Sequence, residues 1–336
     1  MAVVGIRADG NRIIGTGHVM RCLSVAEEIR KLGHTVVFFS ADREMENTIT
    51  GRNFEFVPLE SDWKEISKEL SVFKEKLIQC GVDVLLIDSY YVTPEYLSSL
   101  KEILMTAYID DLYMFDYDVN LIINYSVYAE KNRYGNIEKM ESCMGPSYVP
   151  LREQFKNNFA GSEKKEKSIL ILSGGTDPYG IAKRLPELLL DDSFFDDYSI
   201  TVVSGMFNDT NRLPENDRVR VLSNVSDMAN LMCTAKYAVS AGGTTLYELC
   251  ACGVPGVSYS FADNQFNNVK KFDELGIIPY AGDLRDDFET VLKNISGCIK
   301  RLDDSDYEQI AKKMSELIDG NGARRIAEAI VSLTAK

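Results

Sequence analysis

Two glycines and a histidine near the start of the chain form the pattern with the clearest chemical potential. Gly15, Gly17 and His18 follow a short apolar run, Val3–Ile6, and precede a segment, 19–29, in which apolar residues recur every three or four positions. Glycines let the backbone approach a ligand closely, a helix N-terminus attracts an anion, and a histidine exchanges protons near neutral pH. This spacing indicates proton-transfer chemistry beside a phosphate ester, or else a tight turn whose histidine only caps the helix.

A second glycine pattern lies in the other half of the chain, where Gly242 and Gly243 stand between an apolar run and a helix that contains Glu248. Paired glycines let backbone N–H groups face a diphosphate, and a carboxylate about one turn into the helix can accept hydrogen bonds from ribose hydroxyls. An ordinary glycine turn with a solvated glutamate is the alternative. Gly174–Asp177 repeats the pattern. The predicted nucleotide-binding residues are Gly174, Gly175, Thr176, Gly242, Gly243, Thr244 and Glu248.

Other polar side chains follow predicted strands. Asp88, Tyr90 and the pair Asp110–Asp111 each come after an apolar run. The carboxyl ends of parallel strands share one edge of a sheet, where ligands bind, so we expect these residues at the same edge as His18. Asp263–Gln265 follows a later apolar run and either caps a helix or orients a substrate phosphate or a water.

Composition excludes several classes of function. The formal net charge is -14, and a protein whose main partner is nucleic acid needs a basic face. The chain has only two histidines and no cysteine spacing typical of zinc, so we expect no metal site and no cofactor, with the cysteines as buried thiols and His34 as a structural residue.

The hydropathy pattern bears on location. The sequence shows no apolar run of membrane-spanning length, no signal-peptide pattern and no basic amphipathic segment that would dock to anionic lipid. We therefore expect a cytoplasmic protein with no stable membrane association.

Short apolar runs alternate with helix-period segments in both halves, which is typical of an α/β fold with a parallel sheet covered by helices. A polar, charged stretch at 157–167 separates the halves as a linker. The predicted strands, with the last run closing the series, are Val3–Ile6, Thr35–Ser40, Val82–Asp88, Ala107–Asp110, Leu121–Asn124, Ser168–Leu172, Ile200–Val203, Val219–Leu222, Tyr237–Ser240 and Gly256–Ser260.

The motifs occur in an order that resembles the UDP-2,4-diacetamido-2,4,6-trideoxy-β-L-altropyranose hydrolase family of pseudaminic acid biosynthesis, a pattern also seen in spore coat polysaccharide biosynthesis proteins. The segments that carry the resemblance are Gly15–His18 with Arg21, Asp88–Tyr90, Tyr148–Glu153, Gly174–Asp177 and Asp263–Gln265. A more distant resemblance is to the glycosyltransferase B fold, including the N-acetylglucosaminyltransferase that makes lipid II.

This resemblance implies two Rossmann-like domains with an active cleft between them. Residues 1–156 would supply the chemistry, 168–320 would hold UDP, and 321–336 would form a helix that packs back on the first domain. The family's catalytic histidine matches His18, and its active-site tyrosine and asparagine match Tyr90 and Asn264. The matched positions expected to contact substrate are Gly17, Arg21, Asp88, Arg152 and Gln265.

The resulting hypothesis is a metal-independent hydrolase that releases UDP from a UDP-linked diacetamido-trideoxyhexose. His18 would act as the general base for a water that attacks the anomeric carbon. Three alternatives stay open: a UDP-sugar glycosyltransferase of the same fold, a UDP-N-acetylhexosamine 2-epimerase, and a nucleotide-sugar binding module without turnover.

Overall fold

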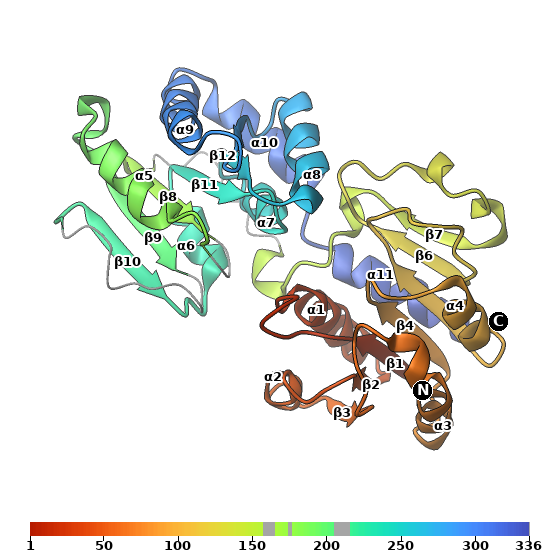
Figure 1. The fold of residues 1–336 in the computed structure, drawn as a ribbon. Helices are drawn as coiled ribbons and strands as arrows, with labels where there is room; N and C mark the ends of the chain where they lie inside the picture. Colours follow the sequence, from red (N-terminus) through yellow and green to blue (C-terminus); the bar gives the residue numbers. More distant parts are fainter. Residues whose placement is uncertain (157–164, 174–176, 205–215, 336) are drawn as a thin grey trace. The chain divides into compact units, whose positions relative to one another are not determined.

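The computed structural model describes residues 1–156, 165–173, 177–204 and 216–335. The chain divides into two compact units, an N-terminal one made of Met1–Arg152 with Gly320–Lys336, and a C-terminal one made of Glu153–Asp319. Each unit is a parallel α/β sheet with helices on its faces (Figure 1). The chain therefore has the predicted fold class.

Seven strands form one parallel sheet in the N-terminal unit, all of them within the described residues, in the order β3-β2-β1-β4-β5-β6-β7. Central strands such as β4 are buried along their whole length, as expected where helices cover both faces of a sheet. The strands are β1 (Val3–Ala8), β2 (Thr35–Ser40), β3 (Glu55–Pro58), β4 (Val84–Asp88), β5 (Met105–Ile109), β6 (Leu121–Asn124) and β7 (Glu141–Met144).

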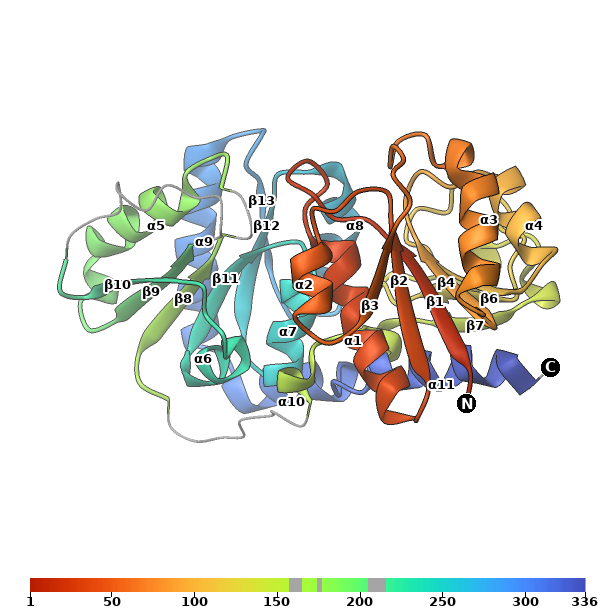
Figure 2. The same ribbon diagram turned by 90° about the horizontal axis from the view of Figure 1, so that it is seen from below.

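The last helix of the chain belongs to this unit. It returns after the C-terminal unit and packs against the first helix (Figure 2). A Cβ on Gly322 would lie 2.2 Å from the carbonyl oxygen of Val149, so only glycine allows the helix to start this close to the backbone. The α-helices of the unit are α1 (Gly17–Lys31), α2 (Glu46–Thr50), α3 (Leu70–Gln79), α4 (Pro94–Lys101) and α11 (Gly322–Ser332).

The C-terminal unit has a parallel sheet of the same design, with six strands among its described residues in the order β10-β9-β8-β11-β12-β13. The strands are β8 (Ser168–Leu172), β9 (Ser199–Ser204), β10 (Val219–Ser223), β11 (Tyr237–Ala241), β12 (Gly256–Ser260) and β13 (Tyr280–Asp283). The helices are α5 (Ile181–Leu190), α6 (Met228–Thr234), α7 (Thr245–Cys252), α8 (Asp263–Glu274), α9 (Phe288–Asp303) and α10 (Tyr307–Leu317).

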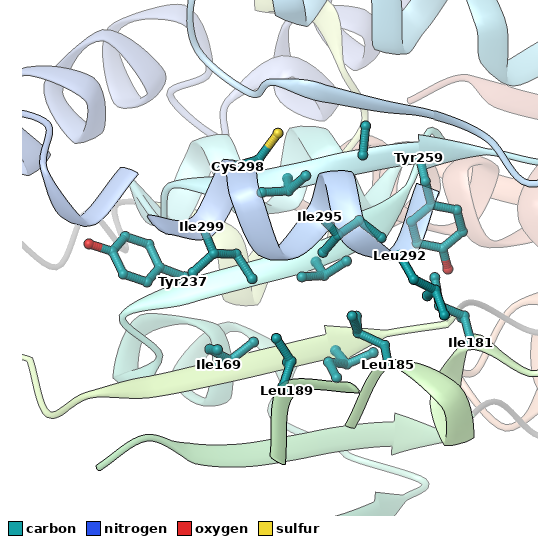
Figure 3. Packing of buried hydrophobic residues seen from close by; sticks show 14 of the residues in the cluster. Ile169, Ile181, Leu185, Leu189, Tyr237, Tyr259, Leu292, Ile295, Cys298 and Ile299 are labelled. Atoms are coloured by element: carbon teal, nitrogen blue, oxygen red, sulfur yellow. The ribbon is translucent and has the colours of Figure 1, made fainter. Parts of the chain in front are cut away.

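One core of this unit forms where α5 and α9 cover a face of the sheet. Leu185 and Leu189 of α5 lie beside Ile169 of β8, and Ile295 of α9 belongs to the same core, as Figure 3 shows; all four side chains are fully buried. Apolar residues three or four positions apart on each helix make this possible, because they form one stripe that faces the strands.

Three strands of the structure were not predicted from the sequence. Since one of them, Tyr280–Asp283, follows Gly256–Ser260, the prediction that Gly256–Ser260 is the last strand is wrong. Glu55–Pro58, Glu141–Met144 and Tyr280–Asp283 each pair at the outer edge of a sheet. Edge strands are covered less completely than central ones, and most residues of these three are only half-buried. Their apolar runs are too short to stand out from loops. The predicted linker falls largely in 157–164, outside the described residues.

Strand order decides where chemistry can occur. The order reverses between β1 and β4 in the N-terminal unit and between β8 and β11 in the C-terminal unit. In open parallel sheets ligands bind beyond the carboxyl ends of the strands at such a reversal. His18 follows β1 and Asp88 ends β4, while the Gly242 turn follows β11. Both predicted sites therefore lie at switch points.

A buried ionic network supports the first of these edges. Arg7 of β1 is fully buried and contacts Glu69 through two nitrogens, at 2.7 and 3.0 Å, and Asp9 at 2.6 Å. Ser61 and Tyr96 also donate to the Glu69 carboxylate. The network ties the central strand to the segment before α3.

None of the helices in the described part of the chain has the length and apolar character that a bilayer crossing requires.

Replacing Glu69 with glutamine tests this network. Glu69→Gln leaves Arg7 buried with only part of its counter-charge, and removing one partner of a buried ion pair typically costs about 3–5 kcal/mol. We expect a loss of that size in the free energy of unfolding, measured by urea denaturation. Glu65→Gln is the matched control, because its pair with Lys68 is largely exposed and should contribute little. Equal effects of the two variants would contradict a structural role for the network.

Candidate active site and nucleotide site

The loop between β1 and α1 positions His18 without using it as a cap. Asn11 closes the loop, with its side chain accepting from the N–H groups of Ile13 and Ile14 and its own N–H donating to Gly15. Gly15 has φ +75°, in the left-handed region that favours glycine. Thr16 is the residue before the helix, and its side chain makes no capping bond. The histidine ring is therefore available for another role.

A buried carboxylate holds that ring. Nδ1 of His18 lies 2.6 Å from Oδ1 of Asp88, the last residue of β4. A contact this short between a ring nitrogen and a carboxylate requires the proton on Nδ1, so the neutral ring carries its lone pair on Nε2. Nε2 makes no hydrogen bond to any described residue. Asp88 thus fixes the orientation of the His18 ring, as the carboxylate of a catalytic triad does for its histidine.

Arg21 completes the ion pair from the next turn of α1. Its Nε and Nη2 contact both oxygens of Asp88, at 2.6 and 2.5 Å, and its Nη1 donates to the hydroxyl of Tyr125 at 2.6 Å. Burial alone would raise the pKa of Asp88, but the charges of Arg21 and His18 outweigh it and hold that pKa well below its usual range. Asp88 therefore stays ionised at the end of the strand.

Tyr90 lies on the other side of the histidine. Its ring packs edge-on against His18 with the ring centroids 4.6 Å apart, and its hydroxyl donates to Asp111 at 2.9 Å. Burial raises the pKa of both Tyr90 and Asp111. Asp110, in contrast, accepts from backbone N–H groups and from two tyrosine hydroxyls, so its carboxylate is occupied by the fold. The structure brings Asp88 and Tyr90 to His18, as predicted from strand order, and Arg21 contacts the same carboxylate.

The Gly242 turn in the C-terminal unit differs from the expected phosphate cradle. The N–H of Gly242 donates to Tyr259 and that of Gly243 donates to Ala241, so both glycine amides are occupied. The amides of Thr244 and Thr245, at the start of α7, hydrogen-bond to no described residue. The N–H groups without a partner among the described residues are therefore those of Thr244 and Thr245, not those of Gly242 and Gly243 as the sequence predicted.

Gly242 has a packing reason of its own. A Cβ at this position would lie 2.4 Å from Val269 and 3.0 Å from Gln265, both on α8. Gln265 also accepts from the N–H of Phe261, which stabilises the start of α8. Asn268 donates to the carbonyl oxygens of Gly242 and Gly243 at 3.0 and 3.4 Å. The turn is thus held by α8.

The remaining predicted residues have these positions. Glu248 lies half-buried in the first turn of α7, Asn264 is exposed in the first turn of α8, and Arg152 lies half-buried at the end of the N-terminal unit. Gly174, Gly175 and Thr176 fall outside the described residues. Asp177, next to them, accepts from the N–H groups of Ile181 and Ala182 and caps α5.

Sequence reasoning missed Tyr125 and Asn268, which anchor Arg21 and the Gly242 turn. Tyr125 follows β6 directly, so the rule that found Asp88 would have found it as well. Asn268 lies inside a helix and carries no local signal.

Among the described residues, no group of three histidine, cysteine or acidic side chains is arranged to hold a metal ion.

Comparison with known proteins supports the resemblance. No family model matches the chain. It is 25% identical to the spore coat polysaccharide biosynthesis protein SpsG of Bacillus subtilis, with 98% of each chain covered. It is 26% identical to the Helicobacter pylori protein described as pseudaminic acid cytidylyltransferase and UDP-2,4-diacetamido-2,4,6-trideoxy-β-L-altropyranose hydrolase, over 82% of this chain. The chain is a distant homologue of these proteins. It is also 29% identical, over 76% of its length, to an uncharacterized protein of Methanocaldococcus jannaschii.

The chain spans about half the length of two of these relatives, 54% of the archaeal protein and 48% of the Helicobacter pylori protein. Among solved structures, MurG of Acinetobacter baumannii matches with a TM-score of 0.71 at 15% identity, and UDP-GlcNAc 2-epimerase of Neisseria meningitidis with 0.65 at 14%. Each covers 99% of this chain and 100% of the other. The chain has the glycosyltransferase B fold.

The histidine geometry predicts opposite tautomers for the only two histidines. Nδ1 of His34 accepts from the N–H of Ala2 at 3.1 Å, which places the proton of that ring on Nε2. Nδ1 of His18 should carry its proton because of Asp88. We expect the nitrogen chemical shifts of the neutral rings to show one tautomer of each kind, and Asp88→Asn to change only His18. Two rings of the same tautomer in the wild-type protein would contradict this geometry.

Proposed function

We propose that the protein hydrolyses a UDP-sugar, releasing UDP and the free sugar. The supporting observation is the orientation of His18 by Asp88, which leaves Nε2 as an unoccupied base at the switch point of the first sheet. The distant homology to a protein whose name includes a UDP-sugar hydrolase supports this reaction class, and we infer a diacetamido-trideoxyhexose as the sugar. The relatives' names point to surface polysaccharide or pseudaminic-acid-like sugar biosynthesis.

His18 would take a proton from water as that water attacks the anomeric carbon. The imidazolium formed in this step lies against the ionised Asp88, whose negative charge stabilises it. Arg21 keeps Asp88 ionised, because its guanidinium contacts both carboxylate oxygens. Tyr90, packed edge-on against the ring, limits its rotation. Losing the proton acceptor in such a step typically costs on the order of 10²–10⁴-fold in rate.

The nucleotide part would be bound by the start of α7. The amides of Thr244 and Thr245 and the positive end of the helix dipole would offset the charge of the diphosphate. Glu248, one turn into the helix, would accept from the ribose hydroxyls. UDP held in this way is a good leaving group, so the reaction needs neither a strong general acid nor a metal ion. We also propose Arg152, Asn264 and Gln265 as substrate contacts, on the basis of their motif positions.

A product assay tests the function directly. The protein is incubated with a panel of UDP-sugars, with and without EDTA, and the products are identified by mass and proton NMR. We expect UDP and free sugar from a diacetamido-trideoxyhexose donor at equal rates in both conditions. Release of UDP only with an acceptor would indicate a glycosyltransferase, an isomeric sugar would indicate a 2-epimerase, and UDP binding without products would indicate a binding module.

Removing the base should separate chemistry from binding. His18→Asn should lower kcat by on the order of 10²–10⁴-fold, because asparagine cannot take up a proton near neutral pH. The Kd for UDP should change little, since the proposed nucleotide contacts belong to the other unit. UDP release and calorimetry on one preparation give both values. His34→Asn is the matched control and should keep kcat. A normal kcat in His18→Asn would show that another group activates the water.

Removing the proposed ribose acceptor should have the opposite effect. Glu248→Ala should weaken UDP binding by about 1–3 kcal/mol, the usual cost of losing a charged hydrogen-bond partner. Glu289→Ala is the control, because Glu289 also lies in the first turn of a helix in the same unit but pairs with Arg184 at the surface. Calorimetry measures both variants. Unchanged affinity in Glu248→Ala would remove this residue from the nucleotide site.

A further inference from the structure

Two cysteines of the C-terminal unit lie in direct contact. The side chain of Cys252, the last residue of α7, lies within hydrogen-bonding distance of the side chain of Cys233 on α6. The Cys252 sulfur also lies 3.8 Å from the carbonyl oxygen of Ala229, one helical turn before Cys233. This second contact fixes the Cys252 side chain against α6 at the level of its partner. None of the seven cysteines is part of a disulfide in the structure.

The two thiols differ in access. Cys252 is buried, whereas Cys233 is half-buried and lines a pocket together with Lys165, Ser168 and Thr234. A small oxidant can therefore reach the sulfur of Cys233 before that of Cys252. The more accessible sulfur, that of Cys233, is therefore the first target of an oxidant.

A cation beside the two cysteines would stabilise a negative charge on their sulfur atoms. Lys165 lies close enough to both thiols to interact with them electrostatically, and its Nζ is buried without a hydrogen-bond partner in the described part of the chain. The ammonium lies 5.6 Å from the centroid of the Tyr307 ring, and a thiolate beside it would supply a full negative charge. The environment of Cys233 thus has the features of a reactive cysteine: partial access, an adjacent cation and a second thiol within reach.

We propose that Cys233 and Cys252 form an internal disulfide when the protein meets a peroxide. Hydrogen peroxide oxidises the Cys233 thiolate to a sulfenic acid, and the peroxide oxygen that is not transferred leaves as water after taking up a proton. The Cys252 sulfur then attacks the sulfenic sulfur, its thiol proton is lost, and the hydroxyl group leaves as a second water. The product links α6 to the end of α7. Neither step uses His18 or a nucleotide, so the cross-link can be tested without the proposed hydrolase activity.

Peptide mapping tests the proposal. The reduced protein is treated with a small excess of hydrogen peroxide, quenched with an alkylating reagent and digested. We expect a cross-linked peptide pair that contains Cys233 and Cys252, a mass lower by two hydrogen atoms, and recovery of both thiols with a reductant. Alkylation of both residues after oxidation, with no cross-link, would overturn the proposal.

Variants separate a specific pair from general oxidation. Cys233→Ser and Cys252→Ser should each abolish the cross-link, and in Cys252→Ser the Cys233 sulfur should remain a sulfenic acid that a dimedone probe traps. Cys80→Ser is the matched control, because Cys80 is also half-buried but lies in the other unit. This variant should form the cross-link as the wild type does. If Cys233→Ser does not fold, Cys233→Ala replaces it, with circular dichroism as the check. A cross-link that persists without Cys233 would refute the assignment.

Discussion

The candidate active site depends on one ion pair. Arg21 and Asp88 meet through two short contacts at the point where the strand order of the first sheet reverses. The pair is buried, which makes a loss of either partner costly, and it joins α1 to the end of β4. His18 shares the same carboxylate, so its tautomer follows from a contact that also stabilises the fold. Asp88 therefore has two functions in the structure: it joins α1 to the sheet, and it orients the His18 ring.

The neighbouring carboxylates show how environment separates roles. Asp88 is held ionised by a cation. Asp110 accepts from three donors in the loop after β5 and from Tyr134 after β6, and Asp111 is buried with Tyr90 as its donor. These three residue positions look alike in sequence, since each follows an apolar strand. Only the charge and the donors around each one decide that Asp88 orients the histidine, whereas Asp110 stabilises a turn.

The two units share one arrangement of strand, turn and helix, but different residues hold the turn in each. In each, a turn after a central strand leads into a helix at the switch point of a parallel sheet. In the first unit that helix start carries a histidine held by a carboxylate from the neighbouring strand. In the second unit α8 holds the turn, because Asn268 binds its carbonyl oxygens and Val269 leaves no room for a side chain on Gly242. Gly242 is thus required by packing against α8, and the N–H groups of Thr244 and Thr245 that follow it hydrogen-bond to no described residue.

The sequence by itself determined the alternation of strands and helices, the position of His18 at a helix start and the edge at which Asp88 and Tyr90 meet it. These follow from hydrophobic period and from the rule for parallel sheets, which depend on residues close together in the chain. Tertiary structure alone decided that Tyr125 and Asn268 take part, that the glycine amides of the Gly242 turn are occupied, and that Glu55–Pro58, Glu141–Met144 and Tyr280–Asp283 complete the sheets. The physical reason is that hydrogen bonds and edge pairing join residues distant in sequence. Their geometry arises only when the strands have taken their order.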